Sequence, residues 1–164
     1  MGLVLSGCKG ISADGITWAI TPSSSGFIKT TKMPSCHVYR NNGGWTATTT
    51  ESVLIFNSVI HNNSNAYNAS TGIFTCPIAG RYMIDVSALA GNAGYAYLNI
   101  RKNNIVQTMY SHQSRAVTGW SNFGLNATVY CAVNDTIQCN YFTGTTAAIY
   151  TAGDYTQMLI TMIG

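Results

Sequence analysis

The chain has 164 residues, 46% of them hydrophobic and 11% aromatic, which is long enough and apolar enough to bury the core of one globular domain. Only 8% of the residues are charged, against about 25% in typical soluble domains, and the formal net charge is +3. The basic residues form no run longer than a pair, so the composition argues against nucleic-acid binding. Uncharged polar residues take the place of charges, which favours a shell-like or extracellular surface over that of a cytosolic enzyme.

Residues 1–34 differ from the rest, with Ser, Thr, Gly and Pro around short apolar pieces such as ITWAI. We interpret them as an N-terminal arm that attaches the protein to a larger assembly. Leu5 to Cys8 matches a lipoprotein cleavage box, but the four residues before it leave no room for a signal peptide, so we expect no secretion signal. No stretch approaches the roughly 18 apolar residues of a membrane span, so we expect no membrane insertion. The apolar candidates for arm attachment are Leu3, Leu5, Ile16, Trp18 and Ile20.

Beyond the arm, short segments rich in β-branched and aromatic residues are separated by Asn, Gly, Asp and Ser, and helical periodicity is nearly absent. This spacing predicts an all-β sandwich. The expected strands span residues 36–40, 52–56, 72–76, 81–89, 95–102, 104–111, 124–133, 135–142 and 155–163. Two of them alternate clearly, which predicts one face on the core. Their inward residues would be Tyr82, Ile84, Val86 and Ala88, and then Leu125, Ala127, Val129, Cys131 and Val133.

Two polar pairs mark tight turns between the expected strands. Asn103-Asn104 and Asn134-Asp135 each stand where a hairpin needs backbone with positive φ, which Asn tolerates. The last expected strand carries apolar side chains on both faces in MLITMI. This pattern indicates either a strand inside the domain or one whose outer face a partner chain covers.

The most distinctive stretch is YNASTGIFTCPIAGRY, residues 67–82. It resembles the signature of the C1q domain family, the jelly roll shared with tumour necrosis factor-like proteins, of the kind found in phage virion proteins. LNIRKNNIV, AVNDTI and YTQMLI follow further family landmarks in the expected order, whereas Met83, Asn134 and Gln157 depart from them. The residues that carry the resemblance are Phe56, Asn57, Tyr67, Asn68, Thr71, Gly72, Phe74, Thr75, Cys76, Pro77, Gly80 and Tyr82.

The resemblance implies that residues 35–164 form a C1q-like jelly-roll sandwich of about ten antiparallel strands, preceded by the arm of residues 1–34. It also implies a compact homotrimer, the usual state of this family. The ten tyrosines exceed what one small core can bury with satisfied hydroxyls, which favours a subunit interface. The candidate residues for that trimer interface are Tyr95, Tyr97, Tyr155 and Leu159.

The sequence carries no pattern of a catalytic or metal site. A glycosidase needs two facing carboxylates, and only Asp135 and Asp154 could become neighbours; capping of turns is the favoured role for them. The histidines share no metal-ligand spacing, and no nucleophile elbow or phosphate loop occurs. We therefore expect no enzymatic activity, no cofactor and no metal. The acidic residues are Asp14, Glu51, Asp85, Asp135 and Asp154, and the histidines are His37, His61 and His112.

Five cysteines occur without a CxxC motif, so a structural zinc site is not expected. Cys131 and Cys139 flank the turn at Asp135 and could face each other on neighbouring strands as a disulfide. The favoured alternative is that they are two small buried thiols.

Two functions follow as hypotheses. The first is a structural protein of a virion surface, made in the host cytoplasm without a signal peptide: a trimer that decorates the capsid or forms a fibre tip, held to a capsid, fibre or tail protein by its arm. The second is a C1q-like recognition module that binds a host-surface glycan or receptor. Such a module would use exposed loop aromatics, for which the candidates are Trp45, Trp120 and Tyr150.

Overall fold

The computed structural model describes residues 9–11, 17–19, 21–22, 28–29, 33–92, 94–115, 119–152 and 155–164. The chain divides into two compact units, Met1–Met33 and Pro34–Gly164. The described residues form β-strands joined by turns and contain no α-helix, so the prediction of an all-β protein is confirmed.

The first unit contains two short antiparallel hairpins. β1 (Lys9–Ile11) pairs with β2 (Thr17–Ala19), and β3 (Thr21–Pro22) pairs with β4 (Ile28–Lys29). Trp18 lies on β2 opposite Gly10. The other residues predicted for arm attachment, Leu3, Leu5, Ile16 and Ile20, lie outside the described residues.

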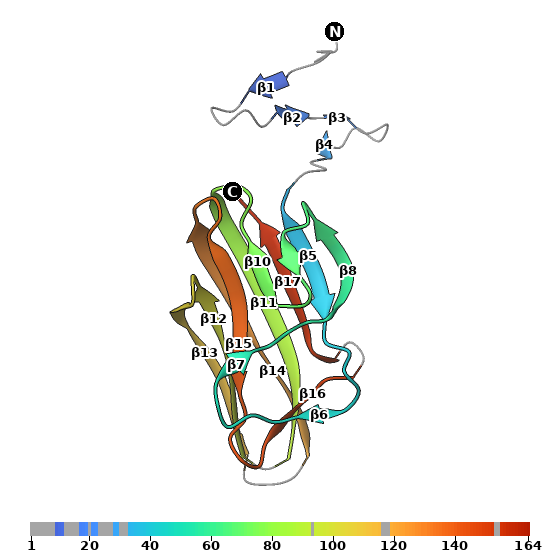
Figure 1. Ribbon diagram of the computed structural model, residues 1–164, viewed down its shortest axis with the longest axis vertical. Coiled ribbons are helices and arrows are strands. Elements are labelled where there is room, and N and C mark those ends of the chain that lie inside the picture. The colour runs from blue at the N-terminus through green and yellow to red at the C-terminus, as the bar shows by residue number, and fades with distance from the viewer. Residues whose placement is uncertain are drawn as a thin grey trace. The chain divides into compact units, whose positions relative to one another are not determined.

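The second unit is a sandwich of two antiparallel sheets, which agrees with the predicted jelly roll (Figure 1). In the sheet that we call the β12–β15 sheet, the order is β13 (Ile105–Arg115), β12 (Gly94–Lys102), β15 (Thr136–Phe142), β10 (Ile73–Thr75) and β9 (Tyr67–Asn68), with β7 (Ser52–Val53) also paired to β15. In the β11–β17 sheet, the order is β6 (Trp45–Thr46), β16 (Ala148–Tyr150), β11 (Gly80–Gly91), β17 (Gln157–Met162), β5 (Ser35–Tyr39) and β8 (Ser58–Asn63), with β14 (Trp120–Cys131) also paired to β11.

The predicted alternation builds the core between these sheets. On β11 the four residues expected to point inward are all buried, and on β14 the same holds as far as Cys131. Val133 is the exception, with half of its surface exposed, because β14 ends at Cys131 and the chain then enters a turn. The hairpin turn predicted at Asn103-Asn104 is confirmed, since both residues have positive φ and β12 pairs with β13. At Asn134-Asp135 only Asn134 has positive φ, and the turn links β14 and β15 of different sheets, so the predicted hairpin is wrong there.

The expected strand over residues 52–56 is shorter than predicted. It ends at Val53, and the chain then leaves the β12–β15 sheet and continues into β8 of the β11–β17 sheet. Leu54 and Phe56 are fully buried in this crossing segment, which explains why the sequence looks like a strand. The apolar side chains fill the core, and the amide of Leu54 still donates to the carbonyl of Cys139 on β15 over 2.8 Å, but Ile55 and Phe56 belong to no strand.

Side chains supply the hydrogen bonds that this buried backbone would otherwise lack. The Arg40 guanidinium donates to the carbonyl of Ile55 over 3.0 Å. The Tyr67 hydroxyl accepts from the amide N–H of Phe56 and donates to the carbonyl of the same residue, both over 3.1 Å. Tyr67 is itself buried, and burial raises the pKa of its phenol, so the hydroxyl stays protonated and can donate.

Replacement of Tyr67 by Phe should therefore destabilise the fold without leaving a cavity. Two buried backbone groups would lose their partner, and we expect the free energy of unfolding to fall by about 1–3 kcal/mol. Urea denaturation measures it. The matched control is Tyr130→Phe, on a tyrosine that is 63% exposed, and it should change the free energy by less than about 0.5 kcal/mol. Equal midpoints for the two variants would contradict the role given to Tyr67.

Candidate binding surface

Four aromatic side chains from different segments meet on the surface of the second unit. The ring of Trp45 lies 6.0 Å from that of Trp120 and 4.9 Å from that of Tyr150. The rings of Trp120 and Tyr150 are stacked at 6.3 Å, and Tyr155 lies 5.5 Å from Tyr150. We call these four residues the aromatic cluster. It contains all three aromatics that the sequence suggested for ligand contact, together with Tyr155, which was suggested for the trimer interface.

The cluster forms where β11 ends. Gly91 is the last residue of β11 and pairs with Trp120 on one edge and Ala148 of β16 on the other. Two residues further along β16, Tyr150 pairs with Trp45 of β6. A Cβ atom at residue 91 would overlap the indole ring of Trp45, so the glycine leaves the space in which that ring lies against the strand.

The backbone around Trp45 is held in place by hydrogen bonds to one threonine. The amide of Asn42 donates to the carbonyl of Thr151 over 2.7 Å. The amide and hydroxyl of Thr151 both donate to the carbonyl of Gly44, over 2.7 and 2.8 Å. The loop before Trp45 is therefore fixed from both sides, and the cluster does not have to be ordered by a ligand.

The rings present a large apolar surface to solvent. Trp120 is 71% exposed, Tyr155 56% and Trp45 40%. Contiguous exposed apolar surface on a folded domain marks an interaction site more often than scattered residues do. An open group of aromatic faces offers stacking and apolar contact, so it suits a ligand with a flat apolar face.

β6 and β16, which carry Trp45 and Tyr150, lie at the end of the β11–β17 sheet opposite the start of β5 (Figure 1). At one end the amide of Arg81 donates to Gly164, and the amide of Met162 donates to the carbonyl of Pro34 over 3.0 Å. At the other end of β11 is Gly91, beside the cluster. Pro34, the first residue of the unit, therefore lies at the end of the sheet opposite to the exposed aromatics.

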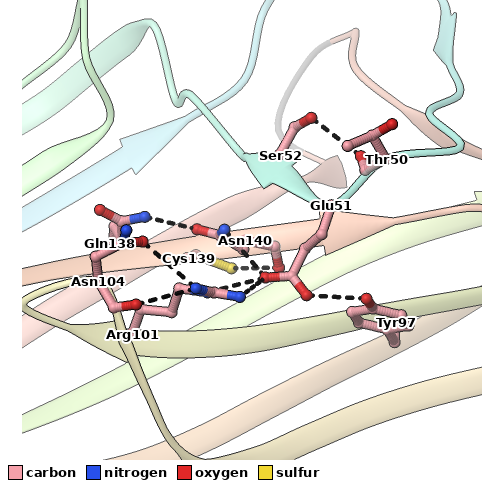
Figure 2. Close-up of polar contacts among 9 residues, drawn as sticks. All are labelled: Thr50, Glu51, Ser52, Tyr97, Arg101, Asn104, Gln138, Cys139 and Asn140. Carbon is pink, nitrogen blue, oxygen red and sulfur yellow. Dashed lines mark hydrogen bonds and ion pairs between the residues drawn. The ribbon is translucent and has the colours of Figure 1, made fainter.

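A second group of polar residues surrounds Glu51 on the outer face of the β12–β15 sheet (Figure 2). The Tyr97 hydroxyl donates to Oε2 of Glu51 over 2.9 Å, and Nδ2 of Asn140 donates to Oε1 over 3.1 Å. Arg101 forms an ion pair with the same carboxylate, donating from Nε over 2.9 Å and from Nη2.

These contacts identify Glu51 as a structural anchor. Partial burial acts to raise the pKa of its carboxyl, but the surrounding hydrogen bonds and the Arg101 cation outweigh that effect, and the pKa is lowered. A carboxylate that is paired and held ionised cannot serve as a general acid at neutral pH. Its effect is to fasten the segment before β7 to β12 and β15.

The residues predicted for the trimer interface lie in three places. Tyr95 and Tyr97 are 5.8 Å apart on β12, and the ring of Tyr97 stacks at 5.2 Å on Phe142 of β15. Leu159 lies on β17 in the other sheet, beside His37, Asp85 and Gln157 in a shallow hollow of its outer face. Tyr155 belongs to the aromatic cluster. The structure does not bring the four residues together within one chain.

Asp135 has the turn-capping role favoured from the sequence. Its carboxylate accepts from the Asn103 side chain over 2.7 Å and from the amide of Ala132 over 2.8 Å, and it pairs with Lys102 at 2.9 Å. The hydrogen bond from Asn103, then that from Lys102, lower the pKa of Asp135 to about 2. Asp154 lies outside the described residues.

Within the described parts of the chain, no group of three or more His, Cys, Asp or Glu side chains could hold a metal ion. The same residues include no helix with the length and hydropathy to cross a membrane. The four described cysteines are free and buried, and Cys131 is in contact with Cys76 rather than with Cys139. The favoured prediction that Cys131 and Cys139 are buried thiols is confirmed, since both are free and buried. The alternative of a disulfide between them is wrong, because Cys131 lies against Cys76.

Comparison with known proteins places this geometry in a family. The sequence model of the C1q domain family matches residues 38–144 of this chain. Among solved structures, the globular domain of zebrafish complement 1qA protein is similar with a TM-score of 0.65 and 17% sequence identity, covering 80% of this chain and 98% of that one. Eiger TNF from S. frugiperda has a TM-score of 0.65 and 10% identity over 81% and 94% of the two chains. Murine APRIL has a TM-score of 0.57 and 11% identity over 80% and 100%.

The ionised state of Glu51 should make the stability of the fold depend on pH. Because the folded protein lowers the pKa of this carboxyl below its usual 4.5, the stability that it contributes is present above that pH and is lost as the pH falls through the lowered value. We expect Glu51→Gln to reduce the free energy of unfolding by roughly 1–2 kcal/mol at pH 7 and by less at pH 3. Urea denaturation at the two pH values measures the difference in the free energy of unfolding between the unaltered protein and Glu51→Gln. A difference that does not change with pH would contradict this assignment.

Proposed function

Because the chain belongs to the C1q domain family, we propose that it is a non-enzymatic homotrimeric module of a virion surface that binds a host-surface glycan or receptor through the aromatic cluster. C1q-like domains typically act as binding or structural modules. The observation that carries the proposal is the cluster itself: three exposed aromatic side chains and a fourth, on a fixed backbone, at the end of the unit away from Pro34.

The chemistry of the cluster favours saccharides among surface ligands. A pyranose ring has a face of C–H groups that packs on aromatic rings, and its hydroxyls need polar partners around the edge. Thr46 supplies a hydroxyl beside the rings, held 3.4 Å from that of the buried Thr151. The surface is open and not a pocket, so each site would contact one or a few sugar units.

A homotrimer is consistent with where the interface candidates lie. In a C3 assembly each subunit uses two different patches, because the contact is heterologous and closes after three subunits. The outer face around Leu159 and the tyrosines of β12 belong to different sheets, as two complementary patches would. Threefold symmetry would then direct three aromatic clusters to the same end of the particle.

The arm would attach this trimer to a capsid, fibre or tail protein. Met1–Met33 forms a compact unit of its own, which supports an attachment segment that is distinct from the C1q-like unit Pro34–Gly164. The very low content of charged residues, 8%, supports a place in a particle surface where neighbouring copies of one protein would otherwise repel each other.

Substitution of Trp120 by Ala should abolish most of the proposed glycan binding. The loss of one largely exposed stacking ring corresponds to about a tenfold weaker affinity. The assay is a glycan array with the full-length protein, followed by titration of the best oligosaccharide. Tyr130→Ala removes a similarly exposed aromatic outside the cluster and should leave binding unchanged, whereas Gly91→Ala should weaken it by displacing Trp45. Absence of binding by the unaltered protein at high concentration, or equal binding by Trp120→Ala, would refute the glycan site.

Deletion of Met1 to Thr31 tests the arm and the trimer together. The truncated protein should remain a trimer by light scattering after size exclusion, because the core formed by the described residues lies within the C1q-like unit, but it should no longer co-sediment with virions. Trp120→Ala in the full-length chain is the complementary control and should still attach to the particle. Normal co-sedimentation of the truncated protein would show that the arm is not the attachment segment. A monomeric truncated protein would show that the C1q-like unit does not assemble by itself.

A further inference from the structure

Two buried cysteines, which the proposed function does not use, are in contact across the sandwich. Cys76 follows β10 in the β12–β15 sheet, and Cys131 is the last residue of β14 in the β11–β17 sheet. Both are fully buried and both are free thiols. The two side chains share a hydrogen bond.

The backbone holds the two residues in this position. The amide of Cys76 donates to the carbonyl of Asp135, and the amide of Asn134 donates to the carbonyl of Cys76, each over 2.8 Å. Asn134 and Asp135 form the turn that directly follows Cys131, and this turn is closed by the side chain of Asp135 on the amide of Ala132. Cys76 is thus tied to the chain on the C-terminal side of Cys131 by two hydrogen bonds.

We propose that Cys76 and Cys131 form a disulfide that links the two sheets when the protein meets an oxidising small-molecule disulfide such as oxidised glutathione. The thiolate of Cys131 attacks the S–S bond of the small molecule, which forms a mixed disulfide and releases one thiolate. The thiol of Cys76 then loses its proton and attacks the sulfur of Cys131, which releases the second small-molecule thiol. Two protein thiols are oxidised and one small disulfide is reduced to two thiols.

The surroundings of the two cysteines make Cys131 the first attacking sulfur and Cys76 the second. The hydrogen bond from the Cys76 thiol lowers the pKa of Cys131, and the cation of Lys102 acts in the same direction against the effect of burial. The same contact raises the pKa of Cys76, which keeps that residue a thiol. Lys102 is held there by its ion pair with Asp135 and by a hydrogen bond of 3.0 Å to the carbonyl of Tyr130. Cys131 is therefore the more readily deprotonated of the two and attacks first, next to a thiol that can complete the exchange.

The other described cysteines lack this arrangement. Cys36 lies on β5, and burial raises the pKa of its thiol to about 12. Burial also raises the pKa of Cys139, whose thiol donates to a backbone carbonyl. These two residues serve as internal controls. Because Cys76 and Cys131 are also covered, exchange needs a local opening, so we expect oxidation to be slow in the folded protein and fast during refolding.

The test is refolding of the full chain in a glutathione redox buffer, in a Cys8→Ala background that removes the remaining cysteine. Trypsin separates the cysteines usefully: residues 33–40 contain Cys36, residues 41–81 contain Cys76, and residues 116–164 contain Cys131 and Cys139. Mass spectrometry should find peptide 41–81 linked to peptide 116–164. The link should persist in Cys139→Ala and disappear in Cys131→Ala and in Cys76→Ala.

The oxidised protein should also unfold at a temperature about 5–10 °C higher than its reduced form, and this difference should vanish in Cys131→Ala and Cys76→Ala. Circular dichroism of each variant shows that it has folded. An internal link within peptide 116–164, a link to peptide 33–40, or the absence of any link after oxidation would overturn the proposal. A link that forms only with loss of the folded spectrum would overturn it equally. None of these results depends on whether the aromatic cluster binds a glycan.

Discussion

The hydrogen-bond register of β11 is the constraint on which the rest of the Pro34–Gly164 unit depends. One edge of this strand pairs with β14 over its whole length, and the other pairs with β17 and then β16. Successive side chains point to opposite faces, so a slip of one residue would turn Tyr82, Ile84 and Val86 out of the core. The register that buries these residues also sets Trp120 beside Gly91, and so the core and the candidate binding surface have a common origin.

The sequence predicted long strands that bury one face, such as β11 and β14, because burial leaves a period of two residues in the chain. It did not predict β8, an edge strand of the β11–β17 sheet in which the consecutive residues Val59 and Ile60 are both largely exposed. An edge strand with little burial carries no alternation. Residues 54–56 show the opposite error, since the side chains of Leu54 and Phe56 fill the core while side-chain hydrogen bonds from Arg40 and Tyr67 replace a strand partner at Ile55 and Phe56.

The sites were harder to predict than the strands, because each joins segments that are far apart in the sequence. Trp45, Trp120 and Tyr150 were predicted as loop aromatics, which is wrong, because each lies on a strand. The contact between them follows from the pairing of β6, β16 and β14 around the end of β11. Cys131 was matched with the nearest cysteine along the chain, whereas its neighbour in space is Cys76. The anchoring role of Glu51 requires Arg101 and Asn140 on two other strands, and no local pattern reveals it.

The character of the cluster determines what kind of recognition the proposed trimer could perform. Stacking on exposed rings gains little free energy per contact, and a surface with 8% charged residues offers little electrostatic steering, so a single cluster would bind weakly. Threefold symmetry changes this, because once one cluster has bound, the other two meet a repetitive glycan surface at a high effective concentration. The gain requires that the three sites keep a fixed geometry. The hydrogen bonds between Thr151 and the loop before Trp45 supply that rigidity within each subunit, so the affinity of the assembly would come from its symmetry and the preorganisation of each site.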